Sequence, residues 1–423
     1  MTTTTLPRPG SVAIESRALV PGPAAVTAIL IALAAWYLNA AISWRQAALF
    51  IVGTGAGVVL YHAAFGFTSA WRVFIADRRG AGLRAQMLML ALTCAVFFPL
   101  LAAGTFMGQP VRGSVSPVGV GVVAGAFIFG LGMQLGGGCA SGTLFSVGGG
   151  STRMLITLFF FIIGSVIGTA HMAWWTAQPA FPATSIVTTM GAWPALAGSL
   201  ALFGAVAWIT LLAERKRHGQ LMDVARPGSP STSLRASPST SRRAGGPAWL
   251  AGPWPLAAGA IGLAVVNIAT LTIGGRPWGV TSAFALWGAK WFAALGIDVA
   301  SWPYWAAPAQ AAALKSSVLM DVTSVMDFGI ILGALLAAML AGRFAPAWTI
   351  PARSIAAAVI GGLLLGYGAR IAYGCNIGAY FSGIASGSLH GWLWLVAAFV
   401  GNIAGTRLRP FFALQVEKTR TAC

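Results

Sequence analysis

The chain alternates between long apolar runs and short segments that carry its charges, prolines and glycine-rich turns. Each run is about 20 residues long, the length that an α-helix needs to cross the hydrocarbon core of a bilayer. The runs lie near residues 24–43, 46–65, 85–107, 117–135, 154–175, 191–213, 248–273, 322–342, 354–372 and 389–406. The pattern predicts an all-α polytopic membrane protein with nine to ten transmembrane helices.

The composition supports this prediction and excludes a large soluble enzyme. Of the 423 residues, 57% are hydrophobic and only 8% are charged, whereas soluble domains carry roughly 25% charged residues. The 54 glycines and 17 tryptophans are typical of packed membrane helices and of their interfacial ends.

The net charge of +18 is a sidedness signal and does not require a nucleic-acid partner. If both termini are cytoplasmic, the predicted cytoplasmic segments hold 20 of the 26 Lys and Arg residues, as the positive-inside rule expects. The six on the other side are Arg45, Arg112, Arg276, Lys290, Lys315 and Arg370. We predict a multi-pass protein of the bacterial inner membrane, with the lipid bilayer as its surrounding partner.

Residues 214–247 are polar and rich in Ser, Pro and Arg, which is typical of a flexible linker. A polybasic stretch also binds anionic lipid, but the plain linker is the favoured interpretation. The predicted organisation is therefore an N-terminal cytoplasmic tail (1–23), a first membrane repeat with an extra N-terminal helix (24–213), the linker (214–247), a second membrane repeat (248–410) and a C-terminal tail (411–423).

The two halves share three motifs in the same order. GFTSA at 66–70 matches GVTSA at 279–283, and a GxxxGT at 164–169 matches one at 401–406. The longest match aligns 130–146 with 366–382 at an offset of 236 and pairs Cys139 with Cys375. The shared positions in this match are Gly130/Gly366, Gly132/Gly368, Gly138/Gly374, Cys139/Cys375, Gly142/Gly378 and Ser146/Ser382.

Five predicted spans separate the start of one repeat from the start of the other. An odd number inverts the second copy, which is a common plan of transporters whose substrate site lies near the midplane. We expect the loops around Cys139 and Cys375 to enter the membrane from opposite sides as short re-entrant helices. Such backbone is tolerated at that depth only where protein or a cavity surrounds it.

Two of the four cysteines stand out. Cys94 lies in an apolar helix as a small filler, and Cys423 is the last residue. Cys139 and Cys375 instead follow Gly138 and Gly374, which allow a sharp turn, and precede helix-like stretches whose N–H groups favour an anion. Close helix packing explains the glycines but not the paired cysteines.

Several chemistries fit two thiols without nearby His or Asp. A zinc site is disfavoured because no CxxC or further ligand is present, and a copper(I) site would have only Met133 nearby. A redox disulfide is possible if the loops touch. A sulfur-bearing anion fits best, because weak S–H donors would pass it on without holding it tightly. We predict no metal and no cofactor.

Other polar residues are candidates with competing structural roles. Ser141 and Asn376, like Thr143, flank the cysteines and would donate to an anion or satisfy loop carbonyls. Arg370 precedes Cys375 by five residues and would attract a dianion or anchor the interface. Asp327 is a candidate for proton coupling, but a dipole-stabilising role near a helix start is favoured. The three histidines near span ends are expected to be interfacial; they are His62, His171 and His390.

The paired GGC-x-SG and YGC-x-x-G motifs, each after a GxTSA segment, resemble those of the YeeE/YedE sulfur-transport membrane proteins. The resemblance covers roughly residues 45–410 without the linker, and Cys139 and Cys375 match the family's two Gly-Cys cysteines. It implies uptake of thiosulfate or a related sulfur compound, or of selenium in some relatives, through an hourglass-shaped helical fold. It also implies a small cytosolic sulfur-carrier protein as a partner. Many members have a further cysteine where this chain has 65–67, Phe-Gly-Phe.

We therefore predict a non-enzymatic importer of a thiosulfate-like anion, whose substrate-binding residues are Cys139, Cys375, Gly138, Gly374, Ser141, Asn376 and Arg370. No Walker A string occurs, so transport is facilitated, ion-coupled or driven by a cytosolic partner. The alternatives are a membrane thiol or persulfide relay, a selenium-compound transporter, and a channel for a neutral solute.

Overall fold

The computed structural model describes residues 21–222 and 248–417, and most of them are helical. Within these residues ten helical segments are long and apolar enough to cross a membrane, which confirms the predicted class of all-α polytopic membrane protein. They are Gly22–Ala41, Trp44–Asp77, Ala81–Ala103, Val120–Gly148, Thr152–Ala170, Ala192–His218, Leu256–Gly274, Val322–Leu340, Ala352–Ala385 and Leu389–Phe412.

The elements are numbered in chain order. The longer helices are α1 (Pro21–Ala41), α2 (Trp44–His62), α3 (Phe67–Asp77), α4 (Ala81–Ala103), α5 (Val120–Gly136), α6 (Ala140–Gly148), α7 (Thr152–Ala170), α10 (Ala192–His218), α12 (Leu256–Gly274), α13 (Thr281–Ala294), α15 (Pro308–Lys315), α16 (Val322–Leu340), α17 (Ala352–Ile371) and α19 (Leu389–Leu408). The short helices are α8 (Met172–Thr176), α9 (Ile186–Met190), α11 (Ala248–Ala251), η1 (Val299–Ser301), α14 (Pro303–Ala306), η2 (Val318–Met320), η3 (Asn376–Phe381), α18 (Ser382–Ala385) and η4 (Arg409–Phe412). Two antiparallel pairs of two-residue strands are β1 (Thr105–Phe106) with β2 (Gln109–Pro110), and β3 (Val118–Gly119) with β4 (Ala180–Phe181).

On both sides of the predicted linker the helix boundary differs from the sequence prediction. Helix α10 continues to His218, so the first five residues assigned to the linker are helical; the buried Glu214 holds this end by accepting from Gly80 N and Arg84. The span predicted from 248 begins at Leu256, because Pro255 precedes the helix and removes a backbone donor. The tail 1–20, the linker residues 223–247 and the tail 418–423, with Cys423, lie outside the described residues.

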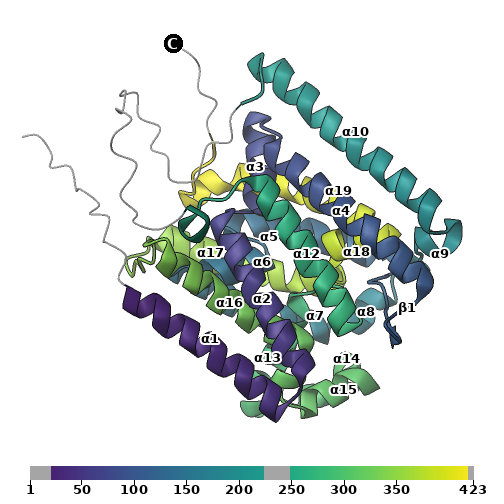
Figure 1. Cartoon of the computed structure of the whole chain (residues 1–423), viewed down its shortest axis with the longest axis vertical. Helices are drawn as coiled ribbons and strands as arrows, with labels where there is room; N and C mark the ends of the chain where they lie inside the picture. The colour runs from purple at the N-terminus through teal and green to yellow at the C-terminus, as the bar shows by residue number, and fades with distance from the viewer. Residues whose placement is uncertain (1–20, 223–247, 418–423) are drawn as a thin grey trace, which may run out of the picture.

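The helices pack in pairs drawn from the two halves of the chain. Helix α17 lies against both α5 and α7, while α5 also lies against α19. In the same way α2 packs on α16, and α4 packs on α12. Helices α1 and α10 lie at opposite edges of the molecule (Figure 1), and both expose large apolar side chains such as Trp36 and Trp208.

Glycines bring the central helices into close contact, as they do in packed membrane helices. A methyl group added at Gly130 would collide with the carbonyl oxygen of Ala398 on α19, and one added at Gly366 would collide with that of Phe161 on α7. A methyl at Gly132 would lie 2.8 Å from Leu365 N. The matched residue Gly368 would place its methyl 2.7 Å from Phe129 N.

The contacts of Gly132 and Gly368 match along the chain. Phe129 and Leu365 are themselves 236 positions apart, the offset that relates Gly132 to Gly368. At this contact each glycine therefore meets the residue that matches the other glycine's partner.

Candidate functional site

The first turn is formed where α5 ends and α6 begins. Gly137 has a φ of +93°, a left-handed conformation that side chains resist, and Cys139 then occupies the extended position before α6. The Cys139 side chain is 2% exposed, and its Sγ lies 3.5 Å from Ser141 Oγ. Thr143 Oγ1 donates to the Cys139 carbonyl oxygen at 2.8 Å, so this turn closes on itself.

The second turn follows α17 and has a more strained backbone. Tyr373 has a φ of +58° and Gly374 a φ of +150°, after which Cys375 precedes the π-helical η3. The Cys375 carbonyl oxygen accepts from Ala379 N at 2.9 Å and from Tyr380 N at 3.3 Å, the second being the wide spacing of a π-turn. Cys375 is fully buried. Such turns are frequent at functional sites.

Glycine before each cysteine has a steric reason. A methyl group at Gly138 would lie 3.2 Å from Thr143 N, and one at Gly374 would lie 2.7 Å from Ala379 N. In both turns the chain folds back onto the helix that follows, so the predicted Gly138 and Gly374 lie at the bend. The second bend is the tighter of the two.

Backbone amides point at both sulfur atoms in matched positions. The N–H groups of Ser141 and Gly142 are directed at the Cys139 sulfur, and those of Ile377 and Gly378 are directed at the Cys375 sulfur. Each thiol therefore lies at the start of a helical segment among donors that favour negative charge.

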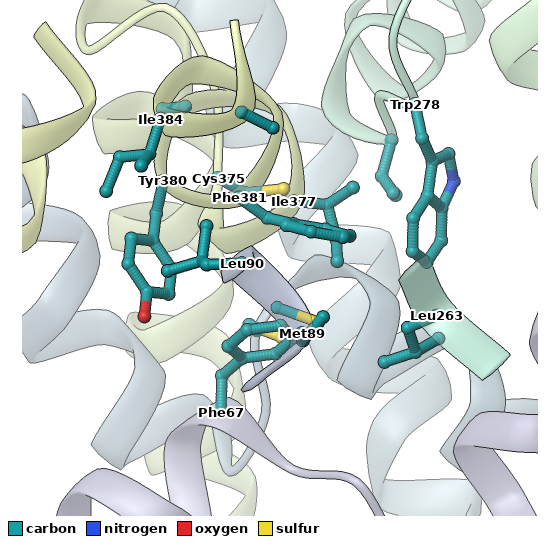
Figure 2. Packing of buried hydrophobic residues seen from close by; sticks show 14 of the residues in the cluster. Phe67, Met89, Leu90, Leu263, Trp278, Cys375, Ile377, Tyr380, Phe381 and Ile384 are labelled. Atoms are coloured by element: carbon teal, nitrogen blue, oxygen red, sulfur yellow. The ribbon is translucent and has the colours of Figure 1, made fainter. Parts of the chain in front are cut away.

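The two turns lie next to each other in the interior. Helix α6 contacts η3, and both cysteines belong to one buried cluster. Cys375 lies within electrostatic range of Cys139 and of Asp327. Figure 2 shows the Cys375 thiol within an apolar cluster that includes Phe67, Met89 and Phe381. The cysteines thus face a largely apolar surrounding with few fixed charges.

The other predicted residues divide into two groups. Ser141 lies beside Cys139, and Asn376 is fully buried beside Cys375 with no hydrogen-bond partner for either polar atom among the described residues. Arg370 is directed elsewhere: Nη1 donates to Tyr304 Oη at 3.2 Å, and the guanidinium lies over the Tyr304 ring at 5.3 Å. The structure therefore gathers the residues of each turn and places the Arg370 guanidinium against α14.

Two polar residues differ from their sequence interpretation. Asp327 was expected to stabilise the dipole near a helix start, but it is the sixth residue of α16, and the acid at the helix start is Asp321, whose carboxylate accepts from Ser324 N at 2.8 Å. Asp327 is fully buried, and neither of its carboxylate oxygens has a partner among the described residues. His390, expected at an interface, is also fully buried and lies 2.6 Å from Ser388 Oγ. Burial of this kind depends on which helix covers the residue, and local sequence does not report it.

Comparison with known protein families shows which family the chain belongs to. A family described as Sulphur transport matches residues 62–404. The chain belongs to the Sulphur transport family. This confirms the resemblance to the YeeE/YedE proteins, since the match includes both Gly-Cys turns.

The chain is also similar to individual transporter proteins. The chain is 28% identical to the thiosulfate transporter TsuA of Spirochaeta thermophila over 361 residues, 83% of this chain and 95% of the relative. It is 30% identical to the probable transporter YedE of Escherichia coli over 177 residues, 41% of this chain and 43% of that relative's length. A 117-residue match to TsuA of Escherichia coli is 29% identical and covers 28% of this chain and 32% of the relative.

Proposed function

We propose that the protein imports thiosulfate or a related sulfur-containing anion across the bacterial inner membrane, along a pathway that passes Cys375 and then Cys139. The single observation that carries the proposal is the convergence of two buried thiols, each with two backbone N–H groups directed at its sulfur. The similarity to a thiosulfate transporter over 83% of the chain supports the substrate class.

The chemistry of the turns suits passage rather than storage. An S–H group is a weak donor and sulfur is polarizable, so each thiol would donate to the anion without binding it tightly. The amides that face the thiols would offset part of the cost of removing the anion from water. Rapid conduction requires such weak, successive sites.

The packing supports an internal pseudo-twofold arrangement. The matched collisions expected for methyl groups at Gly130 and Gly366, and at Gly132 and Gly368, relate equivalent positions of the two halves. We propose that the halves are inverted repeats and that the Gly-Cys turns are re-entrant segments at their shared axis, where transporters of this plan bind substrate.

The arginines support a cytoplasmic location for both termini. Arg409, near the C-terminus, lies within electrostatic range of Arg72 and Arg153, two other residues assigned to the cytoplasmic side. Three basic residues from distant parts of the chain thus gather at one end of the molecule, as the positive-inside rule expects. A small cytosolic sulfur carrier would receive the anion at this end.

The proposal is tested by uptake of ³⁵S-labelled thiosulfate into cells that lack other sulfur importers. Cys139→Ala and Cys375→Ala are each expected to reduce uptake about tenfold, because loss of a weak S–H hydrogen bond to a charged group costs about 1.5 kcal/mol, the low end of the range for such bonds. Cys94→Ala is the matched control: Cys94 is also fully buried, but its Sγ faces the Ile384 carbonyl oxygen at 3.9 Å, and uptake should persist.

Full uptake by both turn variants would contradict the proposed pathway. The same cells separate transport from a thiol relay, because a relay leaves a persulfide or mixed disulfide on one cysteine. Mass spectrometry of the wild-type protein during uptake is expected to find both thiols unmodified; a substrate-derived adduct that forms and disappears with turnover would favour the relay.

A further inference from the structure

One acidic side chain in the interior lacks the partners that buried charges normally have. Asp327 is the sixth residue of α16 and is fully buried, and its two carboxylate oxygens have no hydrogen-bond donor among the described residues. A buried carboxylate without a partner is costly, and binding a proton removes that cost. Intramembrane acidic groups of this kind mark ion pathways and proton relays.

Neighbouring residues fix the direction in which Asp327 faces. Ser324, one turn before it, accepts from Trp287 Nε1 of α13 at 2.9 Å. Ile331, one turn after Asp327, lies against Gly148 of α6: a methyl group added to Gly148 would collide with the carbonyl oxygen of Ile331. Positions 324, 327 and 331 lie on one face of the helix. Asp327 therefore faces the interior between α13 and α6, within electrostatic range of Cys375.

Helix α4 follows the GxTSA segment of the first half, as α16 follows that of the second half, and carries a neutral residue at its sixth position. Gln86 is the sixth residue of α4 and is also fully buried. Its side-chain oxygen accepts from Trp71 Nε1 at 2.9 Å and from Tyr380 Oη at 3.3 Å. The amide nitrogen of Gln86 has no partner among the described residues, so the contrast lies in the oxygens: that of Gln86 accepts two hydrogen bonds, and those of Asp327 accept none there.

We infer that Asp327 carries a proton together with the imported anion, an inference that rests on the proposed function. An anion at the Cys375 turn and an ionised Asp327 repel each other within the apolar interior. Binding of a proton to a carboxylate oxygen removes this repulsion, so anion and proton each favour binding of the other. The proton enters from water on the outer side and leaves to the cytoplasm after the anion has moved on. No bond in the anion breaks.

Few other titratable groups can take this role. Facing Asp327 are Cys375 and, on its own helix, Asp321, which caps α16 and pairs with Arg276 at 3.5 Å. Helix α6 carries no charged residue, although Cys139 precedes it. The other titratable groups on the described helices that pack against α16 are Tyr37 of α1, Arg45, Tyr61 and His62 of α2, and Lys290 of α13. Lys290 donates to the carbonyl oxygens of Leu314 and Ser316 at 2.6 and 2.7 Å.

The experiment uses the full chain in proteoliposomes with ³⁵S-labelled thiosulfate. One proton per thiosulfate dianion leaves one negative charge on the transported pair, so the membrane potential is clamped at zero. An inward gradient of one pH unit should then raise steady-state accumulation by wild type about tenfold. Asp327→Asn, which mimics the protonated acid, should lose this accumulation while exchange of internal for external thiosulfate continues. Asp321→Asn is the matched control, and the gradient should still drive accumulation in it.

The outcomes separate the two proposals. Gradient-driven accumulation by Asp327→Asn at the wild-type level overturns the role of Asp327, as does exchange by wild type with no response to the gradient; both leave the proposed function standing. Absence of any thiosulfate exchange by wild type overturns the proposed function itself. If Asp327→Asn loses exchange as well, Asp327→Glu decides: a shifted pH midpoint of uptake supports the inference, and an unshifted midpoint overturns it.

Discussion

At the first turn, Cys139 lies 3.5 Å from Ser141 Oγ and its carbonyl oxygen accepts from Thr143, whereas at the second turn both polar atoms of Asn376 lack a partner among the described residues. The first turn opens into a regular α-helix and the second into a π-helix after a glycine with a φ of +150°. A similar difference separates the side-chain oxygen of Gln86, which accepts two hydrogen bonds, from the carboxylate oxygens of Asp327, which accept none among the described residues.

This difference teaches that a shared motif need not serve one purpose in both halves. The first turn has its polar groups satisfied internally and resembles a fixed scaffold. At the second turn and nearby, the Asn376 amide and the Asp327 carboxylate have no hydrogen-bond partner among the described residues. Burying such groups destabilises the fold, so their presence calls for an explanation other than stability. Free groups of this kind are available to a ligand, so the second turn is where we expect substrate to be recognised first.

The two turns should differ most, in uptake and in the free energy of unfolding, when the glycine before each cysteine is replaced by alanine. Gly374→Ala places a methyl group at a φ that only glycine adopts readily and 2.7 Å from Ala379 N. We expect loss of uptake and a free energy of unfolding lower by about 1–3 kcal/mol or more. Gly138→Ala, with its nearest atoms at 3.2 Å and no left-handed φ, should have a smaller effect on both.

Uptake of labelled thiosulfate and thermal unfolding in detergent measure these two effects. Gly55→Ala is the control, because beyond its chain neighbours and its own helix backbone no atom of the described residues lies within 4 Å of the added methyl group. Equal stability and uptake in Gly374→Ala and Gly55→Ala would show that the bend at Gly374 is not required.

A smaller effect is expected from the polar side chains beside the cysteines. Asn376→Ala should reduce uptake about tenfold, the cost of a lost hydrogen bond to a charged ligand. It should leave the unfolding temperature unchanged or higher, because the amide has no hydrogen-bond partner to lose within the described part of the chain. Ser141→Ala should reduce uptake only a few-fold. Initial uptake rates and unfolding temperatures are measured for both variants. A larger loss of uptake in Ser141→Ala than in Asn376→Ala would contradict this account.

The smallest effect concerns the ion pair between Arg72 and Glu417, which lies close to Arg409. Arg409 Nη1 donates to the Gln134 carbonyl oxygen near the end of α5, and Glu417 pairs with the neighbouring Arg72 at 2.9 Å. Burial would raise the pKa of Glu417, but hydrogen bonds and charge from Arg72 outweigh it, so the pKa lies below the ordinary value of 4.5. Because the folded-state pKa is lowered, the pair stabilises the protein above about pH 4.5 and this contribution is lost as pH falls further.

Glu417→Gln should therefore lower the free energy of unfolding at pH 7 by less than about 1 kcal/mol, since both side chains are partly solvated. Thermal unfolding at pH 7 and near pH 3 measures the difference from wild type, which should shrink at the lower pH. An undiminished difference near pH 3 would mean that the pair is not the source of the effect.

The sequence predicted the spans well because an apolar run of about 20 residues is stable in a bilayer as a transmembrane helix. It missed the start of α12, where Pro255 interrupts an apolar stretch, and the extension of α10, which depends on contacts of Glu214 with Gly80 and Arg84 far away in the chain. Contacts of this kind exist only after folding.

For the candidate site, the sequence predicted the paired turns because the Gly-Cys motif recurs at a constant offset. It did not predict the burial of His390 or the orientation of Arg370 toward Tyr304, because both depend on which neighbouring helix covers the residue. It placed Asp327 near a helix start but could not distinguish it from Asp321, the residue that caps the helix.

The most direct test of the central claim is protection of the two turn cysteines by substrate. The full chain in liposomes is treated with a membrane-permeant maleimide at rising thiosulfate concentrations, and alkylation of each cysteine is followed by mass spectrometry. We predict that thiosulfate slows alkylation of Cys139 and Cys375 with one concentration dependence and leaves Cys94 unaffected. Unprotected turn cysteines, or equal protection of Cys94, would contradict a shared anion pathway past both thiols.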